Sequence, residues 1–169
     1  MKKIAIVLVI GLCVGLVGVF ADHPGGTGIG VLFRSGYNMK AKGSDGFDIG
    51  LSLKLSSVPA FWGLALNIHD GVFGAGVTGD YYFIDNSLIK DSAFNLGWYL
   101  GLGGYGSLRF DNDMYLAGGG RLPVGLSFQF AKHFEAFLGV AYNLGLRILP
   151  SISFPAHFFN GELGFRVWL

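Results

Sequence analysis

Four histidines are the side chains best suited to metal binding or acid–base chemistry: His23, His69, His133 and His157. No two of them share a strand face or a spacing such as His-x-x-x-His, which would direct two rings at one metal ion. His69 precedes Asp70, and Ser107 could approach this pair at one rim of a folded chain, as a hydrolytic site requires. A histidine in a solvated loop is the more ordinary interpretation. We therefore predict no metal, no cofactor and no enzymatic activity.

Two segments, residues 74–79 and 101–106, match the dinucleotide-binding pattern Gly-x-Gly-x-x-Gly. Such a site needs a helix directly after the glycines, so that the helix N-terminus meets the pyrophosphate. Neither segment is followed by helical periodicity. A chain with 29 glycines among 169 residues produces such matches by chance. We expect no nucleotide site here.

Charged residues that share one phase of an alternating pattern are a stronger signal. They are Arg34, Asp48, Lys54, Asp80, Arg121, Glu135, Glu162 and Arg166. If the flanking segments are strands, all eight side chains point to the same side, and four are positive and four negative. An unpaired charge in a narrow interior is costly, so balanced signs predict a network of ion pairs that closes a lumen. A charged constriction that selects solutes is the functional alternative.

The elements that would position these charges are strands with two distinct faces. In residues 47–56, Phe47, Ile49 and Leu51 begin one apolar face, and Asp48, Gly50 and Ser52 begin the other. The same period of two recurs in residues 28–34, 62–69, 73–83, 94–103, 121–130, 134–141 and 159–169. Eight strands are an even number, as an antiparallel closed barrel needs. The sequence therefore predicts an all-β, eight-stranded, antiparallel up-and-down transmembrane β-barrel.

The composition favours lipid around this barrel. Charged residues are 14% of the chain and hydrophobic residues 51%, whereas an average soluble domain has roughly 25% charge. The bulky face of each predicted strand carries no charge, and the opposite face is mostly Gly, Ala and Ser. Bulky residues therefore face lipid and small ones fill the crowded interior. A net charge of +1 without a basic run excludes a nucleic-acid footprint, and one cysteine excludes a disulfide framework.

Residues 1–21 have the pattern of a secretory signal peptide. Lys2 and Lys3 precede an uncharged run that ends at Phe20, and Ala21 supplies the small residue of a cleavage site. We predict a cleaved signal peptide at 1–21 and a mature outer-membrane barrel at 22–169. An uncleaved anchor is the alternative.

Several segments resemble a family of small spirochaetal outer-membrane β-barrels of undetermined function. They are GDYYF (79–83), GWYLGLGGYG (97–106), GRLPVGLSFQF (120–130) and the closing GELGFRVWL (161–169). The last segment also looks like the terminal assembly signal of outer-membrane barrels. More distantly, the architecture is similar to OmpX- and OmpW-type barrels. The resemblance implies the bacterial outer membrane as location, with lipid and the barrel assembly machinery as partners, and for some relatives a host surface or plasma protein.

The segment 147–157 is expected to be the longest outer loop and the least polar. The candidates for an interaction are its apolar residues, which stand among Pro150, Ser151, Ser153 and Pro155: Ile148, Leu149, Ile152 and Phe154. They could cover the barrel mouth, lie on lipid headgroups or dock to a partner protein. We predict a monomer with a structural or surface-interaction role. A narrow channel or transporter and a host-binding adhesin are the alternatives.

Overall fold

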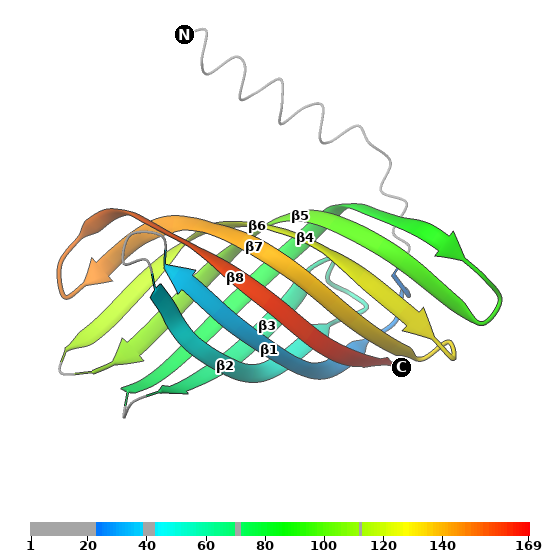
Figure 1. The fold of residues 1–169 in the computed structure, drawn as a ribbon, viewed down its shortest axis with the longest axis horizontal. Coiled ribbons are helices and arrows are strands. Elements are labelled where there is room, and N and C mark those ends of the chain that lie inside the picture. The colour runs from blue at the N-terminus through cyan, green and yellow to red at the C-terminus, as the bar shows by residue number, and fades with distance from the viewer. Residues whose placement is uncertain (1–22, 39–42, 70–71, 112) are drawn as a thin grey trace, which may run out of the picture.

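The alternating segments form eight strands (Figure 1). The computed structural model describes residues 23–38, 43–69, 72–111 and 113–169. The strands are β1 (Gly28–Asn38), β2 (Gly43–Lys54), β3 (Phe61–His69), β4 (Val72–Lys90), β5 (Phe94–Phe110), β6 (Met114–Phe130), β7 (Phe134–Leu149) and β8 (Ser153–Trp168). The predicted signal peptide, residues 1–21, lies outside the described residues and stays a prediction.

The sheet closes on itself. Each strand pairs antiparallel with the next in the chain, and β1 also pairs with β8 from Gly28↔Trp168 to Asn38↔Phe158. This confirms the predicted eight-stranded antiparallel barrel. Both ends of the barrel segment, the start of β1 and the end of β8, lie at one end of the cylinder (Figure 1). We call this the terminal end, and the opposite one the distal end.

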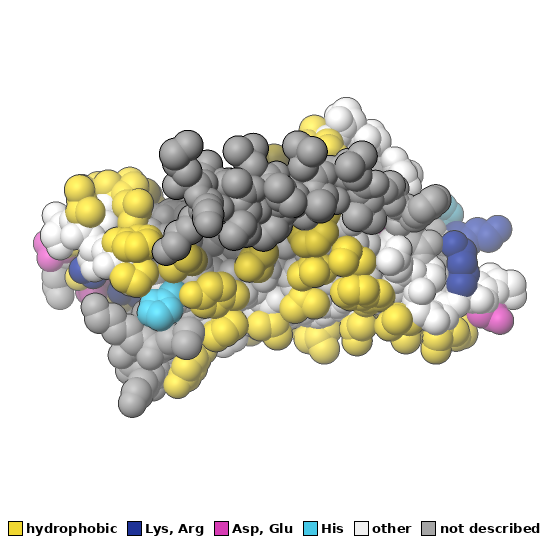
Figure 2. Space-filling model, turned by 90° about the horizontal axis from the view of Figure 1, so that it is seen from above, with side chains coloured by type: hydrophobic (Ala, Val, Ile, Leu, Met, Phe, Trp, Pro, Cys, Tyr) yellow, Lys and Arg dark blue, Asp and Glu magenta, His cyan; other side chains and the backbone are white. Residues whose placement is uncertain are grey.

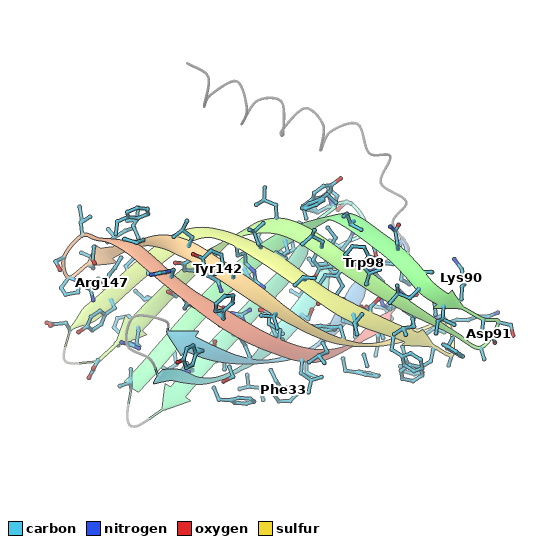
Figure 3. All side chains as sticks on the ribbon, turned by 45° about the horizontal axis from the view of Figure 1, so that its top comes forward. Phe33, Lys90, Asp91, Trp98, Tyr142 and Arg147 are labelled. Carbon is cyan, nitrogen blue, oxygen red and sulfur yellow. The ribbon has the colours of Figure 1, made fainter. Side chains whose placement is uncertain are left out.

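The predicted assignment of the two faces holds along the strands. Leu51, Leu64 and Val124 are 44–50% exposed on the outside, whereas Ser52 and Ala65 are almost completely buried inside. On the face seen in Figure 2, apolar side chains lie along the length of the barrel, and Figure 3 shows side chains projecting from the outside of the sheet. Because successive side chains alternate between faces, one register places the entire bulky set outside.

Two segments that were expected to be connections are strands instead. Residues 84–91 lie between the predicted strands 73–83 and 94–103 and were expected as a turn, but 84–90 continue β4, which pairs with β5 as far as Lys90↔Asn95. The expected loop 147–157 is mostly a hairpin, since β7 runs to Leu149 and β8 begins at Ser153. Bulges in these pairs, at Tyr82/Ile84 and at Gly145/Arg147, absorb the irregular pattern that hid the strands in the sequence.

Aromatic rings gather on the outside near both ends. Phe33 stacks on Phe47 toward the distal end, and Phe130 stacks on Phe134 toward the terminal end. Phe61 and Trp168 also lie toward the terminal end, but they are 7% and 3% exposed and lie inside. Both share the inward phase of their strands, and this phase places them in the lumen. Within the described part of the chain, no helix is long and apolar enough to cross a membrane.

Candidate functional site

The terminal half of the lumen is filled by a cluster around Glu135, which we call the plug cluster. Arg166 Nη1 donates to both Glu135 carboxylate oxygens at 2.8 and 3.0 Å, and Trp168 Nε1 donates to Oε2 at 2.8 Å. His23 lies with Nε2 2.9 Å from Glu135 Oε1 and with Nδ1 2.7 Å from Asp85 Oδ1. Glu135 is 0% exposed. Its charge is thus met by charged and polar groups from β8 and from the segment before β1.

Aromatic rings enclose this cluster. Phe61, Tyr82 and Tyr99 form a continuous stack with ring centroids 4.3 Å apart at each step. The ring of His23 contacts the edge of Phe61 at 5.0 Å, and the guanidinium of Arg166 lies 4.0 Å from the centre of Phe137. Arg166 Nε also donates to Ser52 Oγ at 2.8 Å. Stacked rings leave little room for water, so the barrel is packed solid at this level.

A strand irregularity brings Asp85 into the plug cluster. Asp80 and Tyr82 point inward, and a strict alternation would turn Asp85 to the outside of the barrel. The bulge at Tyr82/Ile84 shifts the phase by one residue, and Asp85 is 4% exposed in the lumen. Its carboxylate also accepts from the backbone N–H of His23 at 3.2 Å. The bulge therefore provides the anchor that holds the segment before β1 inside the barrel.

His23, which precedes β1, is a buried titratable residue between two carboxylates. Burial by itself lowers the pKa of its imidazole, but hydrogen bonds to Asp85 and Glu135 and the charge of both carboxylates outweigh this and leave the pKa raised. The charged form of His23 is thus favoured between two carboxylates.

A second cluster, the central cluster, crosses the middle of the lumen. Glu162 Oε1 accepts from Arg34 Nε and from Arg121 Nη2, both at 2.9 Å. Arg121 Nε lies 3.0 Å from Asp80 Oδ1, close enough for an ion pair but not aligned as a hydrogen bond. Arg34 Nη2 also donates to Thr78 at 3.3 Å. Four strands, β1, β4, β6 and β8, are therefore tied together across the interior.

Six of the eight predicted lumen charges belong to these two clusters, and two do not. Asp48 accepts from Asn67 Nδ2 at 2.7 Å on the wall of β2 and β3. Lys54 Nζ donates to the carbonyls of Leu55 and Val58 and so holds the turn after β2.

Arg121 and Glu135 lie on the adjacent strands β6 and β7 with both side chains inward, but they do not approach each other. Arg121 is opposite Asn143 and Glu135 is opposite Gln129, eight residues further along β6. At roughly 3.3 Å per residue this places the two charges more than 20 Å apart along the strand.

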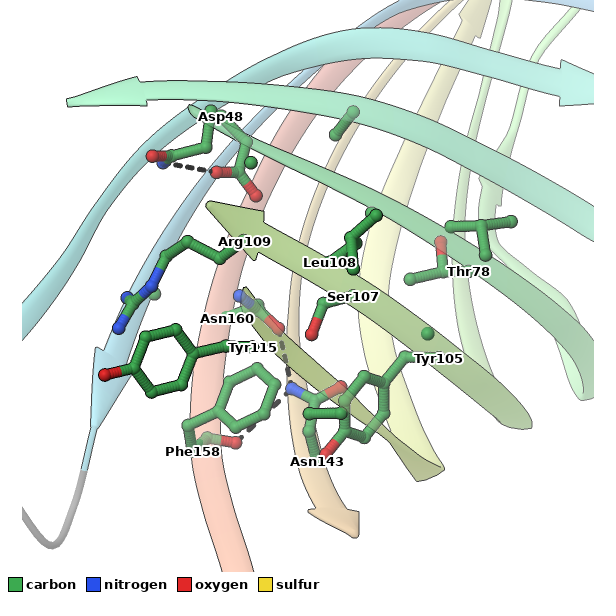
Figure 4. Close-up of a pocket in the computed structure, with 18 of the residues that line it drawn as sticks. Asp48, Thr78, Tyr105, Ser107, Leu108, Arg109, Tyr115, Asn143, Phe158 and Asn160 are labelled. Atoms are coloured by element: carbon green, nitrogen blue, oxygen red, sulfur yellow. Dashed lines mark hydrogen bonds between the residues drawn. The ribbon is translucent and has the colours of Figure 1, made fainter. Parts of the chain in front are cut away.

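The distal half of the lumen is open. A cavity of about 360 Å³ extends from Arg34 and Thr78, which form its floor, to Arg109, Tyr115 and Arg147 near the distal end (Figure 4). Small inward residues such as Gly74, Gly76 and Ser107 line its walls. We call it the distal chamber. Its lining contains no member of the plug cluster, so the central cluster separates the two halves of the lumen.

The apolar candidates of segment 147–157 do not cover this chamber. Ile148, Ile152 and Phe154 are 43%, 81% and 69% exposed. None of them, nor Leu149, lines the chamber, whose wall at this place is Arg147, Ser153, Pro155 and His157. The ring that meets Tyr105 is Phe158, edge-on at 5.2 Å. The cover over the mouth that was one sequence interpretation is therefore not observed, because bulged strands turn these side chains away from the lumen.

The remaining chemical candidates are scattered. His133 Nδ1 is 3.1 Å from the carbonyl of Trp168 at the terminal end, whereas His157 and Ser107 line the distal chamber. Asp70 lies outside the described residues. Residues 74–79 and 101–106 lie within strands β4 and β5. Within the described ranges, no group of three or more His, Cys, Asp or Glu residues could hold a metal ion.

Sequence reasoning missed the role of His23 and Asp85. His23 looked like a solvated histidine, since it follows the predicted cleavage site and precedes the first strand. Glu135 and Arg166 lie opposite each other and their charges balance, so the inward pattern gave no signal for a third partner. Asp85 could not be assigned without the bulge.

Comparisons with known proteins give distant structural likenesses. No family model matches the chain, and no curated protein matches it. Among solved structures, Neisserial surface protein A is 14% identical with a TM-score of 0.46, over 85% of this chain and 96% of that one. The N-terminal β-barrel domain of Pseudomonas aeruginosa OprF is 16% identical with a TM-score of 0.44, over 82% and 96%. Ail, the attachment invasion locus protein of Yersinia pestis, is 13% identical with a TM-score of 0.31, over 85% and 97%.

Proposed function

We propose that this protein is an integral outer-membrane β-barrel with a structural, surface-exposed role and a lumen closed by charged pairs. The observation that carries this proposal is the outer surface of the closed barrel. Large apolar side chains such as Leu51, Leu64 and Leu138 are 44–58% exposed there. Such a belt is a liability in water but is what lipid requires.

The two clusters favour a closed lumen over the channel alternative. Arg121, Glu135 and Arg166 are at most 2% exposed, and aromatic rings stack beside them. An eight-stranded barrel has an interior just wide enough for side chains to fill. We therefore favour a structural or surface-interaction role over transport of solutes.

The distal hairpin supports surface interaction. Ile152 and Phe154 are 81% and 69% exposed at its tip. We propose lipid headgroups or a host or envelope protein as their partner, with the distal end outward. The same proposal includes three further points. They are the resemblance of residues 120–130 to a spirochaetal family, assembly by the barrel machinery and a monomeric state.

Membrane insertion is tested by adding charge to the outer belt. Leu64 lies mid-strand between Leu51 and Val77, so Leu64→Arg should destabilise the folded barrel in vesicles by about 2–4 kcal/mol. Ile152→Arg makes the same change at the hairpin tip and should cost about 0–1 kcal/mol. Urea titration in vesicles measures both. Equal effects, or a parent that migrates identically before and after boiling in SDS, would contradict the proposal.

Planar-bilayer recording tests the closed lumen. The parent should show no steady conductance. Stable channel openings by the parent would favour the transport alternative instead.

A further inference from the structure

The distal chamber has more positive than negative charge on its lining. Arg34, Arg109 and Arg147 line it, and Asp48 is the one carboxylate among its lining residues. Asp48 is already held by Asn67 at 2.7 Å. Asp111 and Asp113, on the turn after β5, are not part of the lining. A negatively charged molecule in the chamber would therefore meet a favourable field.

Two of these arginines differ from those deeper in the lumen. Arg34, Arg121 and Arg166 each pair with a carboxylate at 2.8–2.9 Å. By contrast, Arg109 and Arg147 form no ion pair with any residue that the structure describes, and both lie over the ring of Tyr115, at 5.3 and 5.9 Å. Arg147 Nε is moreover buried without a hydrogen-bond partner. A buried guanidinium N–H without an acceptor is costly, so this site favours an anion.

The chamber has room for more than an inorganic ion. Its volume of about 360 Å³ corresponds to roughly twelve waters at about 30 Å³ each, and lies at the lower end of the usual range for small-molecule sites. Tyr105 and Phe158 meet edge-on at 5.2 Å on one wall, and Leu108 adds an apolar surface. On the neighbouring strand β4, Gly74 and Gly76 have no side chain to fill this space. A flat or aliphatic body fits between these surfaces.

We propose that the distal chamber binds small organic anions. The acidic group lies at Arg109 and Arg147 beside Tyr115, and the apolar body lies against Tyr105 and Phe158. This binding site goes beyond the structural role proposed above and does not depend on the membrane assignment, because it rests on the lining of the chamber alone.

The test compares two probes that differ in charge, 4-fluorobenzoate and its neutral analogue 4-fluorobenzamide. Fluorine NMR titration of the whole folded barrel in a neutral detergent measures the Kd of each. The benzoate should bind at least about tenfold more tightly than the amide, since a hydrogen bond to a charged group is stronger than one between neutral groups. Arg109→Gln and Arg147→Gln should each weaken benzoate binding by about tenfold.

Lys132→Gln removes one positive charge at the terminal end, in the turn between β6 and β7, and should leave the benzoate Kd unchanged. Heat-dependent mobility on SDS gels checks that every variant folds. Arg109 is exposed, so its variant keeps the test valid if the Arg147 variant fails to fold. Equal Kd values for the acid and the amide, or no effect of Arg109→Gln, would overturn the proposal. If inorganic phosphate binds as tightly as the benzoate, the apolar wall has no part in binding and the organic anion is rejected.

Discussion

Glu135 in the terminal half of the lumen is completely buried and bound by Arg166, His23 and Trp168, whereas Arg109 and Arg147 in the distal half face an open chamber. Both halves are built from the same alternating strands and the same face of each strand. They differ in how the inward positions are filled. Stacked rings and paired charges occupy one half, whereas many inward positions of the other are Gly, Ala or Ser beside a few long side chains such as Arg109 and Tyr105. A barrel of eight strands can thus be plugged or hollow, depending on its inward side chains alone.

The two halves show how one barrel combines a tightly bonded interior with an open chamber. Pairs in the central cluster join strands that are not neighbours in the sheet, such as β6 with β8 and β4 with β6. In the distal chamber, Asn143 Nδ2 donates to Asn160 Oδ1 and Asn67 Nδ2 donates to Asp48 Oδ1, both at 2.7 Å, and each bond joins neighbouring strands. We infer that the closed half holds the fold and the distal half is free to vary.

The largest effect is expected from breaking the plug cluster. Glu135→Ala leaves the buried Arg166 without its carboxylate and should destabilise the barrel by about 3–5 kcal/mol. Asp48→Ala removes a carboxylate from the distal chamber and should cost about 1 kcal/mol, since it loses one partly exposed hydrogen bond. Urea unfolding followed by tryptophan fluorescence measures both. Similar losses for the two variants would show that the halves do not differ in this way.

A smaller effect is expected from adding one methyl group to inward glycines. A Cβ at Gly103, beside the central cluster, would meet Gly79 O and the Asp80 side chain, so Gly103→Ala should destabilise by about 1–3 kcal/mol. At Gly76 in the distal chamber the nearest atoms are Gly106 O at 3.7 Å and Arg34 Nη1 at 4.0 Å. Gly76→Ala should therefore be neutral or stabilise by up to about 1 kcal/mol, because alanine restricts the unfolded chain. The same urea-unfolding assay measures the stability of both variants. A large loss of stability for Gly76→Ala would mean that the chamber is filled.

The smallest effect is a pH dependence confined to the closed half. Since the pKa of His23 is raised in the fold, its contribution to stability is complete below its ordinary pKa of about 6.5 and is lost as pH rises through the raised value. The groups facing it are Asp85, Glu135, Tyr82, Tyr99 and Trp168. Stability measured from pH 5.5 to 9.5 should fall across the alkaline part of this range in the parent.

His23→Gln is the matched variant, because it keeps hydrogen bonding to Asp85 but does not titrate. This variant should show a flatter profile than the parent over the same range. A parent and a variant with parallel profiles would remove His23 as the cause.

The barrel and the assignment of its two faces could be predicted from the sequence alone. The period of two in segments such as 47–56 allows only strands, and bulky charge-free residues on one face with small residues on the other decide which side is outside. The same phase placed Arg34, Asp80, Arg121, Glu135, Glu162 and Arg166 inside without reference to any contact. Alternation is a local property of the chain, and local properties can be read from it directly.

Which of these charges form ion pairs depends on the tertiary structure and could not be predicted. Arg121 pairs with Glu162 and Asp80 rather than with Glu135, because the register of β6 with β7 and the closure of β8 on β1 set the level of each side chain along the lumen. Bulges near Ile84 and Arg147 shift the phase of single strands, bringing Asp85 to His23 and turning Phe154 away from the mouth. Register, bulges and the diameter of the closed sheet arise from pairing between strands, and no single segment of the sequence contains them.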